Sequence, residues 1–233
     1  MCTVTYVPTE NNYIFTTNRD EHISRADSNF PIKRSINGEM VYFPQDPVAN
    51  GTWIASSKTK LICVLNGGFI KHKHQPPYRR SRGLIVLDRF EYNGFKDFVE
   101  SVDLDNIEPF TMIAIDFNSD KHQLYELVWD GDVKHFRLFD NNNKYIWSSS
   151  PLYPDDVKAI RQVLFQQADL NSKDAILQFH KSKPSTLARP YQFIMKRDNG
   201  LLTMSTTQIS WETTDKIMHH ISYVNQQDEI IKV

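Results

Sequence analysis

Cys2 is the residue whose position points most directly to chemistry. Aminopeptidases remove an initiator Met when the second side chain is small, and removal of Met1 would leave a thiol and an α-amine on one residue. An α-amine titrates at about 7.7–8.0 and a thiol at about 8.5, so proton transfer between them is nearly balanced at neutral pH. Because a nearby base is a general way to activate a weak attacking group, the start of the chain predicts an N-terminal nucleophile.

A charged cluster at residues 18–21 follows a predicted hairpin. Residues 2–7 have the alternation of a strand that ends at Pro8, and residues 13–17 return as a second strand. An antiparallel return carries Arg19 and Asp20 back towards Cys2. We expect Arg19 to stabilise the thiolate and Asp20 to orient the α-amine by accepting its hydrogen bond. The alternative is a surface ion pair in a turn, worth only about 0–1 kcal/mol.

Asn66 ends a second predicted hairpin, formed by residues 53–56 and 61–65. Its amide NH₂ is a suitable donor to a tetrahedral oxyanion, and loss of one such donor typically costs about 10²–10³ in rate. The alternative is a plain turn, because Asn-Gly is a common turn dipeptide. Cys63, in the apolar strand of this hairpin, is interpreted as a core residue.

Other polar clusters give weaker signals. His72 and His74, and the pair at 219–220, lack a neighbouring acid or Cys in the sequence, so solvated side chains are favoured over a metal site. The basic run at 79–82 precedes a predicted helix and could hold a phosphate or carboxylate there, but a solvated turn is favoured.

Strands gather towards both ends of the chain and helices lie between them, which predicts an α+β fold in a single domain, residues 1–233. The helix near 154–168 is expected to bury Val157, Ile160 and Leu164, and the next one Ile176, Leu177 and Phe179. The further elements are predicted helices at 81–92 and 95–102, strands at 111–117, 123–129, 134–139 and 145–147, and a final hairpin at 201–211 and 216–223.

Composition sets limits on the class of protein. The 233 residues, 40% of them hydrophobic and 12% aromatic, are enough for a sizeable core. A net charge of −1 gives no reason to expect nucleic acid or an anionic membrane as partner. Two cysteines make no disulfide framework, no leader is apparent, and no stretch approaches the roughly 20 apolar residues of a membrane span. We therefore expect a cytoplasmic protein.

Several motifs in order resemble one family. Met1-Cys2-Thr3 and the Asn-Arg-Asp-Glu run at 18–21 are similar to the NRDE family, whose eukaryotic members are the Transport and Golgi organisation 2 homologues. The likeness continues along the chain through five further motifs: Gly51-Thr52-Trp53-Ile54-Ala55, Leu65-Asn66-Gly67, Arg82-Gly83-Leu84, Pro109-Phe110-Thr111 and Trp147-Ser148-Ser149-Ser150. It weakens after about residue 168.

That family resembles the N-terminal nucleophile hydrolases, nearest to the choloylglycine hydrolase and penicillin V acylase group. The resemblance implies a four-layer αββα sandwich with two stacked antiparallel sheets. It also implies a catalytic site of Cys2, Arg19, Asp20 and Asn66. Where acylases place a second Asn, this chain has Ser149, and at 205–207 it lacks an Arg that relatives often carry.

The function implied is hydrolysis of a non-peptide C–N bond in the amide of a small acyl compound, with no cofactor. The alternative is a non-catalytic carrier of haem, acyl-CoA or lipid on the same fold, which the departures at Ser149 and at 205–207 would suit. The expected partner is accordingly a small-molecule acyl substrate or a hydrophobic ligand, without nucleic acid.

Overall fold

The computed structural model describes residues 3–118 and 121–233, so Met1 and the predicted nucleophile Cys2 lie outside the described residues. The described chain divides into two compact units. Residues 3–27 and 142–232 form the first unit, and residues 28–118 and 121–141 form the second. Each unit is built around one antiparallel sheet, which confirms the α+β class.

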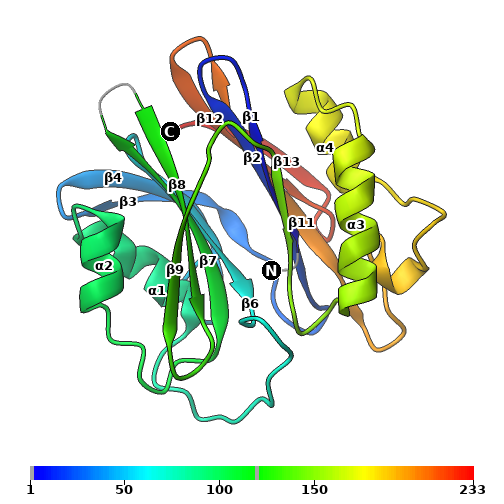
Figure 1. The fold of residues 1–233 in the computed structure, drawn as a ribbon, viewed down its shortest axis with the longest axis horizontal. Coiled ribbons are helices and arrows are strands. Elements are labelled where there is room, and N and C mark those ends of the chain that lie inside the picture. Colours follow the sequence, from blue (N-terminus) through cyan, green and yellow to red (C-terminus); the bar gives the residue numbers. More distant parts are fainter. Residues whose placement is uncertain (1–2, 119–120) are drawn as a thin grey trace. The chain divides into compact units, whose positions relative to one another are not determined.

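The first unit contains a six-stranded sheet in the order β10-β1-β2-β11-β12-β13. Helices α3 and α4 lie against one face of this sheet (Figure 1). The elements are β1 (Thr3–Pro8), β2 (Tyr13–His22), β10 (Tyr145–Ser148), α3 (Asp155–Gln167), α4 (Lys173–Lys181), a 3₁₀ turn (Arg189–Tyr191), β11 (Leu201–Glu212), β12 (Asp215–Ser222) and β13 (Gln227–Lys232).

The predicted N-terminal hairpin is confirmed, and its second strand is longer than expected. In the β1–β2 register Thr3 lies opposite Asn18 and Tyr6 opposite Phe15. Strand β2 continues to His22 because β11 pairs with it from Phe15, opposite Ile209, to His22, opposite Leu201. The charged cluster is therefore part of a central strand and not of a turn.

Helix α3 packs on the sheet through a different face from the one predicted. Its buried side chains are Val157, Arg161 and Phe165, whereas Ile160 is 40% exposed. Spacing of four residues places these three side chains on one face. Helix α4 buries Ile176, Leu177 and His180, with Phe179 half-buried. The prediction was thus wrong only at Ile160, since the predicted Leu164 and Phe179 are half-buried against the core. It did not include the buried polar residues Arg161 and His180.

The second unit contains a seven-stranded sheet in the order β3-β4-β5-β6-β7-β8-β9, with α1 packed on β5 and β6. The rings of Phe90, Phe95 and Phe98 form part of its core. The elements are β3 (Asn29–Ile36), β4 (Glu39–Gln45), β5 (Ile54–Ser56), β6 (Lys60–Asn66), α1 (Arg82–Asp88), a 3₁₀ turn (Arg89–Glu91), α2 (Phe95–Ser101), β7 (Phe110–Asn118), β8 (Lys121–Trp129) and β9 (Lys134–Phe139).

Two glycines in the second unit allow the backbone before β5 to touch the start of α1. The amide of Thr52 donates to the carbonyl of Gly83 (3.1 Å). A Cβ on Gly51 would meet the Gly83 carbonyl carbon at 2.5 Å, and a Cβ on Gly83 would meet Thr52 backbone atoms at 2.9 Å. The motifs at 51–55 and 82–84 are therefore two sides of one backbone contact.

No helix in residues 3–118 and 121–233 is long and apolar enough to cross a membrane. Cys63 is fully buried in β6, as predicted.

Candidate active site

Arg19 and Asp20 lie side by side in β2 and are 3% and 2% exposed. Neighbouring residues of a strand point to opposite faces of the sheet. Arg19 is in register with Ser205 on β11 and its Nη1 contacts the sulfur of Met204 at 3.2 Å. Asp20 points to the other face. Their burial rules out the surface ion pair that was the alternative interpretation.

The carboxylate of Asp20 is held by two hydroxyls from different elements. Thr203 on β11 donates to Oδ1 (2.6 Å), and Tyr153, just before α3, donates to Oδ2 (3.1 Å). A buried carboxylate is tolerated when such hydrogen bonds replace its water. Asp20 is therefore fixed in orientation on the strand that pairs with Thr3, the residue covalently next to Cys2.

Asn18 is a structural residue of β2. Its Nδ2 donates to the carbonyls of His180 (3.0 Å) and Phe193 (2.9 Å). Its Oδ1 accepts from Thr206 (2.8 Å) and lies 3.1 Å from His180 Nδ1. Since both amide hydrogens have partners, Asn18 ties β2 to the segments that cover it.

Sequence reasoning missed Arg161, which is fully buried on α3. Its guanidinium donates to the Thr3 hydroxyl, to Ser148 Oγ (3.0 Å) and to the Tyr191 carbonyl (2.7 Å). It also lies over the Tyr153 ring, 4.2 Å from its centre. In the sequence, Arg161 follows Ile160 inside a helix, and a charged residue there gives no signal of burial.

Ser149 is buried directly after β10, and its carbonyl accepts from the amides of Leu152 (3.2 Å) and Tyr153 (3.1 Å). This turn brings the Tyr153 hydroxyl to Asp20. The first unit therefore connects Ser149 to Asp20 through Tyr153, while Arg19, the neighbour of Asp20 in β2, points to the other face of the sheet.

Asn66 belongs to the second unit, where it is the last residue of β6 and is opposite Phe110 of β7. Gly67 follows with φ of 84°, and its amide donates to the Pro109 carbonyl (2.9 Å). The predicted turn after the strand is thus present. The role of Asn66 as an oxyanion donor stays a prediction.

Two buried histidines in the first unit are held neutral. Burial, assisted by the charge of Arg161, lowers the pKa of His180 to about 3. Burial is also the main cause that lowers the pKa of His220 to about 4. His180 Nε2 lies 2.7 Å from the Thr5 hydroxyl, and His220 Nδ1 lies 2.8 Å from that of Thr207. The expectation of a solvated histidine was wrong for His220.

The histidines at 72 and 74 have a carboxylate partner that the sequence did not reveal. Glu108 Oε1 lies 3.1 Å from His72 Nε2 and 3.0 Å from His74 Nδ1, while Oε2 pairs with Arg82 (2.9 Å). Burial acts to raise the pKa of Glu108, but the charge of Arg82 and the histidine hydrogen bonds lower it overall. Within the described residues no group of three potential ligands is arranged to hold a metal ion.

The basic run is also occupied by acidic partners. Arg80 makes a two-pronged pair with Asp88 (2.7 and 3.0 Å), and Arg79 pairs with Asp103 (3.0 Å). Ser81 caps the short helix α1 by accepting from the Gly83 amide. These contacts give Arg79 and Arg80 carboxylate partners within the chain, so a bound anion is not needed to explain this basic run.

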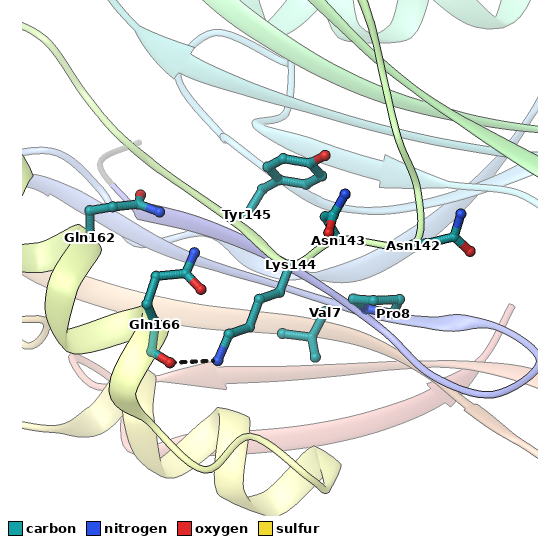
Figure 2. A pocket seen from close by; sticks show the side chains of 8 residues that line it. All are labelled: Val7, Pro8, Asn142, Asn143, Lys144, Tyr145, Gln162 and Gln166. Carbon is teal, nitrogen blue, oxygen red and sulfur yellow. Dashed lines mark hydrogen bonds between the residues drawn. The ribbon is translucent and has the colours of Figure 1, made fainter.

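A groove of about 650 Å³ in the first unit lies at the other end of β1. Its lining consists mainly of amide side chains and Tyr145, and Lys144 reaches across it to the carbonyls of Gln166 (3.1 Å) and Ala168 (3.3 Å) (Figure 2). Lys144 thereby closes the C-terminal end of α3. Among the described residues of this unit, Arg19, Asp20 and Ser149 do not line the groove.

Comparison with known proteins agrees with the motifs at the N-terminus. Among curated proteins, no sequence matches this chain. The family model described as Transport and Golgi organisation 2 matches residues 1–149, which include β1, β2 and Asn66 as well as Ser149. Because this match covers more than half of the 233 residues, the chain belongs to the Transport and Golgi organisation 2 family.

Proposed function

We propose that this protein is an N-terminal cysteine hydrolase that cleaves a non-peptide C–N bond in the amide of a small acyl compound. The observation that carries the proposal is the buried, oriented carboxylate of Asp20, bonded to Tyr153 and Thr203. A buried carboxylate is costly, and its place on the strand that pairs with Thr3 suits a partner at the start of the chain.

The proposed reaction begins after removal of Met1. The α-amine of Cys2 takes the thiol proton, and the thiolate attacks the carbonyl carbon of the amide. Arg19 favours the thiolate, while Asp20 orients the amine. Asn66 and backbone amides donate to the oxyanion of the tetrahedral intermediate, and Ser149 supplies a second polar group where acylases have an amide.

Collapse of that intermediate breaks the C–N bond. The α-amine, now protonated, returns its proton to the departing amine, and the acyl group remains on Cys2 as a thioester. Water, deprotonated by the same α-amine, then attacks the thioester carbonyl. Release of the carboxylic acid restores the thiol, so the cycle consumes one water for each amide and requires no cofactor.

The first test is the intact mass of the purified protein before and after reaction with a mild acyl ester probe, with Cys2→Ala and Cys63→Ala as variants. We expect a mass without Met1 and one adduct that maps to Cys2. The adduct should be absent in Cys2→Ala and kept in Cys63→Ala, the matched control in a buried position.

An Asp20→Asn variant tests whether Cys2 reacts because its thiol is activated by Asp20 and the α-amine, or only because the thiol is exposed to the probe. The amide keeps the size of the side chain but cannot accept an ammonium proton as strongly, so acylation should slow by about 10²-fold or more, the scale of general base catalysis. Retention of Met1, or acylation no faster than that of an unfolded cysteine peptide, would overturn the hydrolase proposal in favour of a ligand carrier.

A further inference from the structure

Arg161 is a buried cation whose described partners are all neutral. Besides Thr3, Ser148 and Tyr191, its Nη1 lies 3.4 Å from the carbonyl of Gln192. No carboxylate of residues 3–118 or 121–233 pairs with it, in contrast to the buried Arg89 of the second unit, which pairs with Asp116. Burial of a charge without an opposite charge costs several kcal/mol, so packing alone does not explain an arginine here.

Two aromatic rings stabilise this cation. The centre of the guanidinium lies 4.2 Å from the Tyr153 ring centre and 4.3 Å from that of Phe193. Such cation–π contacts are strongest where water is excluded, as at this buried site. They neutralise no charge, so the positive potential of Arg161 extends to the groups around it.

Those groups adjoin both ends of the proposed nucleophile–carboxylate pair. Thr3, which accepts from Arg161, is joined by one peptide bond to Cys2. Tyr153, whose ring lies against the guanidinium, donates through its hydroxyl to Asp20. Ser148, the third contact, is in register with Thr3 across β10 and β1. A single side chain on α3 thus connects the start of β1 with the residue that holds Asp20.

We propose that Arg161 is a positioning residue for the nucleophile, an inference that rests on the proposed function. By holding Thr3 and Tyr153 it fixes the start of β1 and the hydroxyl that donates to Asp20. Its charge would also favour the thiolate over the thiol in the residue that precedes Thr3. It favours a neutral α-amine over an ammonium for the same reason.

The experiment measures the rate at which iodoacetamide alkylates Cys2, from pH 5 to 9, with the adduct located by peptide mass spectrometry. The variants are Arg161→Met, which removes the charge, and Arg161→Lys, which keeps it. Arg197→Met is the matched control, since Arg197 also donates to a carbonyl (Leu152, 2.6 Å) and lies over a tyrosine ring (Tyr191). Unlike Arg161, it has no hydrogen bond to Thr3 and its ring contact is not with Tyr153.

We expect the midpoint of the rate–pH profile to rise by about half a unit or more in Arg161→Met. Arg161→Lys should keep a midpoint close to that of the unmodified protein, and Arg197→Met should leave it unchanged. Circular dichroism at each pH confirms that the variants are folded. A purely structural role would lower stability in Arg161→Met without moving the midpoint.

The outcomes separate the two proposals. If the unmodified protein alkylates rapidly at Cys2 and Arg161→Met has the same midpoint, the positioning role is wrong while the nucleophile stands. If the unmodified protein shows no activated Cys2, the nucleophile is wrong and the inference about Arg161 falls with it. If Arg161→Met does not fold, Arg161→Lys provides the test. Because lysine keeps the charge, a midpoint in this variant as high as that of an unfolded cysteine peptide would contradict the role of the charge.

Discussion

Buried cations are treated differently in the two units. In the second unit, two buried cations pair with carboxylates: Arg89 with Asp116 (2.6 Å) and Lys60 with Glu39 (3.1 Å). In the first unit, Arg161 is bonded to hydroxyls, carbonyls and rings, and Asp20 accepts from the hydroxyls of Tyr153 and Thr203.

This difference in pairing indicates which buried charges can influence a reaction. A close pair of opposite charges cancels most of its own field, so the pairs of the second unit act mainly on stability. A charge bonded to neutral dipoles keeps its field, which can shift the pKa of a neighbouring thiol or amine. This difference supports the proposal that the thiol, Arg19 and Asp20 of the first unit form the reactive centre.

The largest effect is expected from breaking the Arg89–Asp116 pair. Arg89→Met would leave the buried carboxylate of Asp116 with the Phe95 amide but without its cation, so unfolding free energy should fall by about 3–5 kcal/mol. Urea denaturation measures this. The double variant Arg89→Met, Asp116→Asn should regain much of the loss; an unimproved double variant would show that packing, and not charge pairing, dominates.

As pH falls, the first unit should lose stability at a higher pH than the second unit. His180 and His220 have folded pKa values of about 3 and about 4, below the value of about 6.5 for an unfolded histidine, so the unfolded chain binds more protons between these values. Stability is therefore present above pH 6.5 and is lost as pH falls. From pH 7 to 5 the expected loss is about 1–2 kcal/mol for each histidine.

The lowered carboxyl pKa values of Glu39 and Glu108 place the second unit's loss of stability below their ordinary value of 4.5. Hydrogen exchange at pH 5 should therefore show faster opening of β1, β2 and β11 than of β6 and β7. A His180→Gln variant should reduce the slope of stability against pH. Equal acceleration in both units would contradict the comparison.

Arg161→Met should lower the unfolding free energy by about 1–3 kcal/mol, less than Arg89→Met. The reason is that it leaves neutral acceptors without a donor but leaves no buried anion without its cation. The same urea titration compares the two. A loss as large as that of Arg89→Met would mean that Arg161 compensates a negative charge in the folded protein.

The smallest effect is expected at Ser205. Its hydroxyl is fully buried with no hydrogen-bond partner in the described chain, although it is in register with Arg19. Ser205→Ala removes this unpaired group, so stability should stay within about 0.5 kcal/mol or rise. Thr206→Val is the control, because Thr206 bonds to Asn18 and Tyr223 (both 2.8 Å), and it should cost about 1–2 kcal/mol.

Much of the fold follows from hydrophobic pattern. The hairpins at the start, the centre and the end, and four helices, lie close to their predicted residues. Strands β3, β4 and β13 were not predicted. Two of them, β3 and β13, are edge strands with exposed charged residues such as Lys33, Arg34 and Asp228, and an exposed edge needs no alternating apolar face.

The candidate site was predictable only where a motif marked it. Arg19 and Asp20 were found because the motif and the hairpin register coincide. Arg161, Tyr153 and Thr203 come from α3, its preceding loop and β11, between 130 and 190 residues along the chain. Their bonds to Asp20 and Thr3 join residues 133 to 183 positions apart, so they depend on tertiary packing and not on local sequence.

The place of β1 inside its sheet also bears on the timing of synthesis. Strand β1 lies between β10 and β2, and Thr3 is fully buried in the finished protein. At about 5–20 residues per second, the ribosome needs about 7–27 seconds after making β1 before residues 145–148 exist to pair with it. The hydrolase proposal therefore implies that an aminopeptidase can act on Met1 while β1 still lacks β10 as its second neighbour.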